Sequence, residues 1–332
     1  MLKLLPRAMR HSSNWAETMR PNSLVQIQNP AEFRNALTHI RMRLQSRGEQ
    51  TKLRQFVLLD FKHAKESTSL GALPPSSLGQ EPAGVNLYGD LPESELARNG
   101  PRLIEIPDNE AAIEAICAHA INDESASFIL AGCTLDMLAT HLQALREVML
   151  PDGGAALFRF QDVHVTSALW PLLDTRRANR VLGPAMGWLV RDACGELICL
   201  EHPVGSTRQT TNKTFSIDRN MLAALNEALL PWTVAEQIDE IDSSLLHGLR
   251  ACGRRTLVRE RLARGRGQGL SQTDDLALYC ALSLQLPDGF EKIEPFAKAL
   301  AATRAGSRRF GEYLDKIPAE QWDVTDKLLN TL

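Results

Sequence analysis

Short blocks of apolar residues separated by polar turns fill the first two thirds of the chain. After Asn29-Pro30, one helix is predicted to residue 47, with four apolar side chains spaced along one face: Phe33, Leu37, Ile40 and Leu44. Continuous apolar runs follow at 55–60 and 127–131, and such runs are typical of buried strands. Helices and strands therefore alternate, which predicts a sheet covered by helices.

The segment from Leu145 to Asp162 contains the clearest local signal. It reads LREVMLPDGGAALFRFQD, and its Pro-Asp-Gly-Gly centre favours a tight turn because Pro fixes φ and Gly accepts positive φ. We therefore predict a hairpin whose second strand runs to Phe160. Phe158 and Phe160 would face the core, and Arg159 would point to the opposite face.

The pattern changes in the last third of the chain. Residues 207–214 are polar and rich in threonine, and from Phe215 onwards the apolar spacing is helical only. Separate helices are expected from Asp218, through 238–249, along a basic stretch to Arg266, and from residue 271 onwards. The predicted fold is an α/β, mixed-sheet N-terminal lobe followed by an all-α helical C-terminal lobe. Its expected parts are a flexible tail (1–28), the α/β lobe (29–206), a linker (207–214) and the helical lobe (215–332).

Composition narrows the function classes only slightly. The 332 residues are long for a single core, and a hydrophobic fraction of 44% is ordinary for a globular protein. A net charge of −3 gives no overall attraction to nucleic acid or to an anionic membrane. No apolar run approaches the ~20 residues of a membrane span. The six cysteines are scattered without metal-ligand spacing, and we expect most of them to be small buried residues of a reduced cytoplasm.

Catalytic motifs are missing from the sequence. It has no nucleophile elbow and no phosphate-binding loop, so we predict no catalytic residues, no cofactor and no metal. Asp60 ends the first apolar run, where it could cap the next turn or present a carboxylate at the sheet edge. Together with His63 and Glu66, Asp60 forms the one local acid/base cluster, which keeps an unrecognised enzyme open as an alternative.

Positive charge is concentrated in one segment, the arginine-rich helix predicted over 250–266. Helical spacing puts Arg255, Arg259 and Arg266 near one face. Three interpretations stay open: a solvated helix face, a surface for an acidic protein partner, and a nucleic-acid-binding surface. The last of these lacks visible stacking aromatics, so we expect no nucleic-acid partner.

Several segments in a fixed order resemble a known family. They are FVLLD at 56–60, LARNGPRLIEI at 96–106, LPDGGAALFRFQD at 150–162 and the helical stretch 257–290. Together they are similar to the type VI secretion adaptor or effector-chaperone family, whose defining segment is known as domain of unknown function 4123. The chain departs from the usual pattern after Phe160, where the family commonly has an aromatic residue and then Asp-Pro; here Gln161-Asp162-Val163 stands.

The resemblance implies binding rather than catalysis. A cytoplasmic adaptor of this kind holds a cognate effector protein and helps load it on the tip of the VgrG spike, often with a PAAR-type module. The candidate protein-binding residues are Arg159, Asp162, Asp60, Arg255, Arg259 and Arg266. For Arg159 and Asp162 two interpretations remain: an ion pair that orders the corner after the hairpin, with Asp162 also able to cap the next helix, or a polar anchor for a segment of the effector.

Overall fold

The chain divides into two compact units, the first ending at Leu225 and the second beginning at Asn226. The structure, a computed structural model, describes residues 27, 29–46, 52–60, 84–92, 97–108, 112–114, 116–118, 126–202, 214–318 and 320–322. The first unit contains all the strands of this described part, and the second is helical. The predicted fold class, an α/β lobe followed by a helical lobe, is confirmed.

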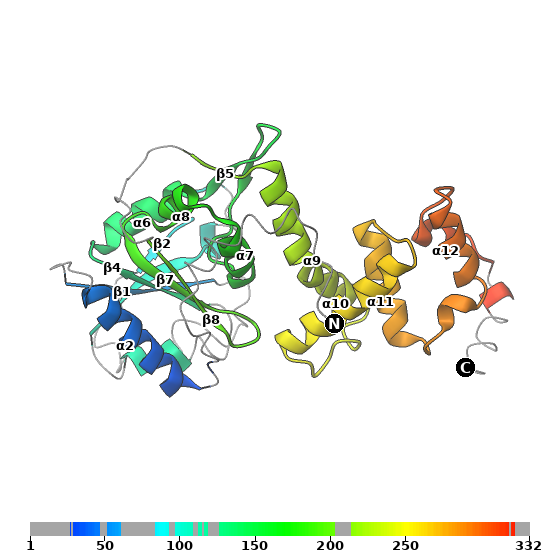
Figure 1. The fold of residues 1–332 in the computed structure, drawn as a ribbon, viewed down its shortest axis with the longest axis horizontal. Coiled ribbons are helices and arrows are strands. Elements are labelled where there is room, and N and C mark those ends of the chain that lie inside the picture. Colours follow the sequence, from blue (N-terminus) through cyan, green and yellow to red (C-terminus); the bar gives the residue numbers. More distant parts are fainter. Residues whose placement is uncertain are drawn as a thin grey trace, which may run out of the picture. The chain divides into compact units, whose positions relative to one another are not determined.

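A six-stranded sheet forms the centre of the first unit (Figure 1). Its order is β2-β3-β1-β4-β7-β8, and each neighbouring pair is antiparallel. The strands are β1 (Arg54–Leu59), β2 (Gly84–Asn86), β3 (Arg102–Ile106), β4 (Ala126–Ala131), β7 (Ala185–Arg191) and β8 (Leu197–Glu201). The mixed pairing that we predicted occurs in a second, smaller sheet instead of this one.

Helices cover both faces of the large sheet, because its strands are apolar on both sides. In β1, Val57 packs in one core with side chains of helix α2 (Pro30–Ser46). Figure 1 shows α2 beside the sheet. Phe56 faces the other core, which is completed by α6 (Leu135–Ala144), α7 (Val163–Leu169) and α8 (Thr175–Leu182). The predicted buried stripe of α2 is confirmed at all four positions.

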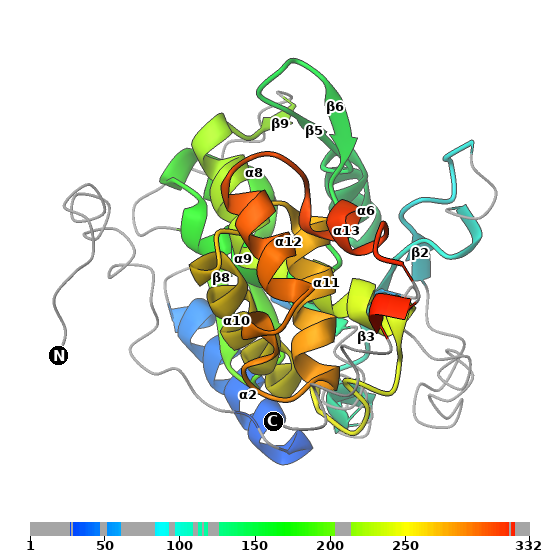
Figure 2. The same cartoon turned by 90° about the vertical axis from the view of Figure 1, so that its right-hand side faces the viewer.

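The predicted hairpin is present, but its second strand is shorter than expected. It joins β5 (Glu147–Met149) to β6 (Ala155–Leu157), and β9 (Phe215–Ser216) pairs with β5 in parallel to complete the small sheet (Figure 2). The strand ends before Phe158. Phe158 and Phe160 are nevertheless buried, whereas Arg159 is partly exposed, so the predicted orientation holds without the predicted strand.

Trp170 marks a second local correction. The sequence predicts a helix over 165–173 that Pro171 breaks; in the structure the α-helix already ends at Leu169, and a short 3-10 helix (Trp170–Leu172) follows. Pro171, which has no backbone N–H, stands inside that turn. The Trp170 ring packs edge-on against Trp188 of β7, with 6.0 Å between the ring centroids.

Three boundaries differ from the expected ones. Ile27 fell in the predicted tail, yet it is fully buried and its N–H donates to Gly195 O at 2.8 Å. Phe215, which we expected to begin a purely helical region, lies in β9 and packs in the core of the first unit. Met221 is part of the same core, so the first turns of α9 (Arg219–Ile241) pack with the sheet unit. Most of the predicted linker, 207–213, lies outside the described residues.

The second unit has a core of its own, built around Tyr279, Phe290 and Phe310. Where we expected two helices, α9 continues without interruption from Arg219 to Ile241 although it contains Pro231, and residues 243–248 form turns. Further helices described in this unit are α10 (Ala251–Gly267), α11 (Thr273–Gln285), α12 (Phe296–Arg304) and α13 (Phe310–Leu314), with a 3-10 turn at Phe290–Lys292.

Candidate functional site

Two of the candidate residues converge on a third at one corner of the first unit. Arg159 lies two residues after β6, and its Nη2 is 3.4 Å from an oxygen of Asp60 and 3.4 Å from an oxygen of Asp162. Asp60 directly follows β1, and Asp162 directly precedes α7. The side chains of both aspartates are at least nine-tenths buried, whereas 31% of the Arg159 side chain is exposed. Of the three charged side chains in this cluster, only that of Arg159 is substantially exposed to solvent.

Asp162 has a second role in the same place. Its Oδ1 accepts hydrogen bonds from the backbone N–H of His164 at 2.9 Å and of Val165 at 3.4 Å, so it is the N-cap of α7. Helix capping and pairing with Arg159 are the two structural roles that the sequence predicts for Asp162, and the structure shows both. The other interpretation of Asp60, a cap of the following turn, concerns residues 61–83, which lie outside the described part.

Tyr88 and Gln161 extend the corner inwards. The hydroxyl of Tyr88 donates to Oε1 of Gln161 at 3.0 Å, and both side chains are buried. Burial raises the pKa of Tyr88 to about 12, and the negative charge of Asp60 adds to this shift. Gln161 occupies one of the positions after Phe160 at which the sequence departs from the pattern of the similar family. Its hydrogen bond to Tyr88 connects the segment after the hairpin to the turn that contains Tyr88.

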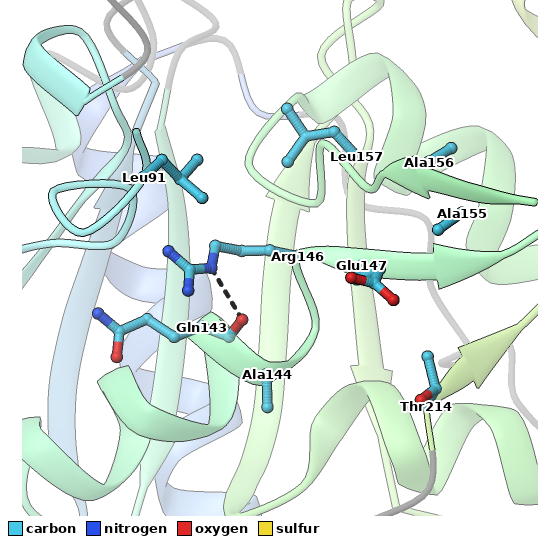
Figure 3. Close-up of a pocket in the computed structure, with 9 residues that line it drawn as sticks. All are labelled: Leu91, Gln143, Ala144, Arg146, Glu147, Ala155, Ala156, Leu157 and Thr214. Atoms are coloured by element: carbon cyan, nitrogen blue, oxygen red, sulfur yellow. Dashed lines mark hydrogen bonds between the residues drawn. The ribbon is translucent and has the colours of Figure 1, made fainter. Parts of the chain in front are cut away.

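A pocket of about 600 Å³ lies between Leu91, the end of α6 and the hairpin (Figure 3). Sequence reasoning did not find it. Its lining combines small and apolar side chains with a few polar ones: Leu91, Gln143, Ala144, Arg146, Glu147, Ala155, Ala156, Leu157 and Thr214. Leu157 is 41% exposed. The strand-like spacing of Ala155 and Leu157 was the signal that could have indicated an apolar outer face.

Arg146 forms one wall of this pocket and is held firmly within the chain. Its guanidinium group pairs with both carboxylate oxygens of Asp90 and also donates to Leu87 O and Gln143 O, each at 2.9 Å. The hydrogen bonds that Arg146 donates to Asp90 raise the pKa of Arg146, and the same contact lowers the pKa of Asp90. The positive charge of Arg146 is therefore already compensated inside the wall.

The arginine-rich helix lies in the second unit as α10, and its side chains are largely engaged. Arg266 donates two hydrogen bonds of 2.6 Å to Glu227, and Arg255 lies 5.9 Å from the ring centroid of Trp232. Arg264 pairs with Asp288 at 2.9 Å and with Glu291 at 3.0 Å. Arg259 is exposed. A surface that binds nucleic acid usually presents a continuous patch of uncompensated arginines. The arginines of α10 do not form such a patch.

The described part of the chain gives little support for a metal site, an acid/base cluster or a membrane span. Within it, no three His, Cys, Asp or Glu side chains come together as metal ligands. His63, the partner in the proposed acid/base cluster with Asp60, lies outside that part. Cys117 and Cys280 are free, buried thiols. None of the helices described combines the length and the apolar composition that crossing a bilayer demands.

Comparison with known families gives one match. Residues 55–180 match the family model described as Domain of unknown function (DUF4123). The chain contains a domain of this family. The DUF4123 segment includes Asp60, Arg159 and Asp162, and also every pocket residue except Thr214. Neither the curated proteins nor the solved structures that were compared with the chain gave a match.

Proposed function

We propose that the protein is a non-catalytic, cytoplasmic adaptor of type VI secretion. In this role it binds one cognate effector and helps to load that effector onto the VgrG spike tip, with a PAAR module as a further partner. The observation that carries the proposal is the DUF4123 match over residues 55–180, because this segment overlaps the ordered motifs on which the resemblance to the adaptor family rests.

The geometry of the two candidate regions suits binding better than turnover. The carboxylates of Asp60 and Asp162 face Arg159, and Asp162 is also hydrogen-bonded to the backbone of α7. Such a cluster orders a corner of the fold. The pocket beside it is open and lined by small, apolar and a few polar side chains, as expected of a surface that receives part of another protein.

Deletion of the gene tests the proposal in the host. We expect secretion of one effector to be lost while the tube protein and other effectors are still exported. The tagged full-length chain should co-purify with that same effector. Equal loss of every effector and of the tube protein would show that the protein is a general component instead. A catalytic turnover that disappears on Asp60→Asn would favour the enzyme alternative.

A further inference from the structure

The outer face of the small sheet carries one row of side chains that the fold does not use. In β5 and β6, Glu147 stands opposite Leu157, and Val148 stands opposite Ala156. Val148 also pairs with Phe215 of β9, which places Thr214 beside Glu147. Because neighbouring side chains in a strand alternate between faces, Val148, Ala156 and Phe215 point inwards. Leu157, Glu147 and Thr214 form the exposed row that lines the pocket (Figure 3).

The hydrogen bonds of the hairpin show which backbone groups of β6 are directed outwards. Phe158 N–H donates to Arg146 O at 2.7 Å, and Leu150 N–H donates to Gly154 O at 2.8 Å. Hydrogen-bonded and non-hydrogen-bonded pairs alternate in an antiparallel ladder, so Ala156 bonds to β5. The N–H and C=O groups of Ala155 and Leu157 therefore point away from β5. Within the described residues β6 pairs with β5 alone, which leaves this side of β6 as a sheet edge.

Charge indicates what this edge would accept. Glu147 is exposed, and no ion pair of Glu147 occurs in the part of the chain that the structure describes. Its neighbour Arg146 is saturated by Asp90 and two carbonyl groups, so the wall offers Glu147 no cation. The edge thus combines outward backbone groups, an exposed leucine and an uncompensated carboxylate.

We propose that β6 receives an added strand from a partner protein, in which Lys or Arg residues alternate with apolar residues. A Lys or Arg opposite Leu157 would lay its aliphatic stem over that side chain and bring its cation to Glu147. The apolar residues in between would fall on the inner face, beside Ala156. A second copy of β6 does not fit this edge, because it supplies no cation and would bring another Glu147 towards the first. The inference rests on the proposed binding role and specifies the chemistry of the segment bound.

The test uses the full-length chain and a fluorescent ten-residue peptide of alternating lysine and valine. A matched peptide of alternating glutamate and valine is the control, and fluorescence polarisation measures binding. We expect the lysine peptide to bind and the glutamate peptide not to bind. Glu147→Gln should weaken binding about two- to five-fold, the size of one exposed ion pair. Glu147→Lys should weaken it further, whereas Glu236→Lys, an equal charge change at an exposed position of α9, should leave it unchanged.

A backbone variant tests the strand addition independently of charge. Ala155→Pro removes an outward N–H without touching the ladder to β5, and proline is tolerated at such edge positions. We expect the melting temperature to stay constant and peptide binding to be lost. Equal binding of the two peptides, or an unchanged affinity in Glu147→Lys and in Ala155→Pro, would overturn the inference.

Co-purification separates this inference from the adaptor proposal. If the wild-type chain and Glu147→Lys retain the effector equally, the edge strand is not the binding site although the adaptor role stands. If no effector is retained but the lysine peptide binds in a Glu147-dependent way, the adaptor role fails and the edge site stands. Loss of the effector in Glu147→Lys and its retention in Glu236→Lys would support both.

Discussion

Asp60 and Arg159 lie 99 residues apart in the sequence, yet Nη2 of Arg159 stands 3.4 Å from a carboxylate oxygen of Asp60. The contact joins the end of a central strand to the segment that follows the hairpin. Because Asp60 is almost completely buried, its carboxylate depends on partners inside the protein. Arg159 is one of these partners, and it is also within 3.4 Å of Asp162.

Replacement of Arg159 therefore acts first on stability. We expect Arg159→Ala to lower the free energy of unfolding by about 1–2 kcal/mol, less than the loss of a fully buried partner because the guanidinium group is partly exposed. Chemical denaturation measures the change, and Arg159→Lys, which keeps the charge, should lose less. Affinity for the effector should remain. Unchanged stability combined with weaker co-purification would show that Arg159 is an anchor for the partner instead.

The two roles of Asp162 can be separated by a pair of variants. Asp162→Ala removes both the cap of α7 and the contact with Arg159, and we expect it to cost about 1–2 kcal/mol. Asp162→Asn keeps an oxygen that can accept the N–H of His164 but loses the charge. It should recover most of the stability if capping dominates. Thermal unfolding of the two variants compares the roles, and equal losses would assign the stabilisation to the charge.

Tyr88 makes stability sensitive to high pH. Its pKa is raised to about 12 in the folded protein, against about 10 in an unfolded chain. The folded state thus favours the neutral phenol, so this contribution is complete below pH 10 and is lost as the pH rises towards 12. We expect the stability difference between wild type and Tyr88→Phe to shrink over that interval. Denaturation at a series of pH values measures it, and a difference that stays constant would contradict the assignment.

Gly183 is required where α8 ends and β7 follows. Its φ is +52°, and a Cβ placed on it would come within 2.2 Å of the His141 ring. Gly153, in the hairpin turn, also has a positive φ of +86° but has open space around it. We expect Gly153→Ala to cost about 1 kcal/mol and Gly183→Ala about 2–4 kcal/mol, because only the latter adds a clash in a packed region. Similar losses in the two variants would mean that the His141 ring moves aside easily.

In the helical unit, the comparison of two arginines tests whether α10 is a structural element or a binding surface. Arg264 donates to Glu291, which also accepts the hydroxyl of Tyr279 at 2.6 Å. Burial alone would raise the pKa of Glu291, but these hydrogen bonds outweigh it and lower the pKa. We expect Arg264→Ala to cost about 1 kcal/mol at neutral pH, and this loss should fade as the pH falls below about 4.5.

Arg259→Ala is the matched control, because Arg259 is exposed on the same helix. Its stability should equal that of the wild type. A salt-dependent affinity for DNA that falls in Arg259→Ala while stability is retained would revive the nucleic-acid interpretation of α10.

Local patterns predicted those parts of the fold that local forces determine. The apolar run of β1, the buried stripe of α2 and the turn at 151–154 were all found in the sequence and are present. Phe215 shows where this reasoning stops. It stands next to a polar stretch, and its strand exists only because β5 offers a partner more than sixty residues earlier in the chain.

The same distinction applies to the candidate site. Arg159 and Asp162 are close in sequence, so their pairing was foreseeable, and the strand end pointed to Asp60 as a candidate. Their convergence depends on how β1 and the hairpin are placed in the fold, which no local pattern specifies. The pocket could not be predicted, because its walls come from four separate segments and include residues as ordinary as Ala144 and Thr214.

The small sheet has a consequence for how this domain can be inherited. The family match ends at residue 180, but β7, the neighbour of central strand β4, begins at Ala185, and β9 and the first turns of α9 belong to the same core. The segment that matches the family model, residues 55–180, is therefore shorter than the first compact unit, which extends to Leu225. A recombination event that moved only residues 55–180 to another protein would leave behind β7 and β8, two of the six strands of the large sheet, so a viable exchange has to carry the chain as far as Leu225.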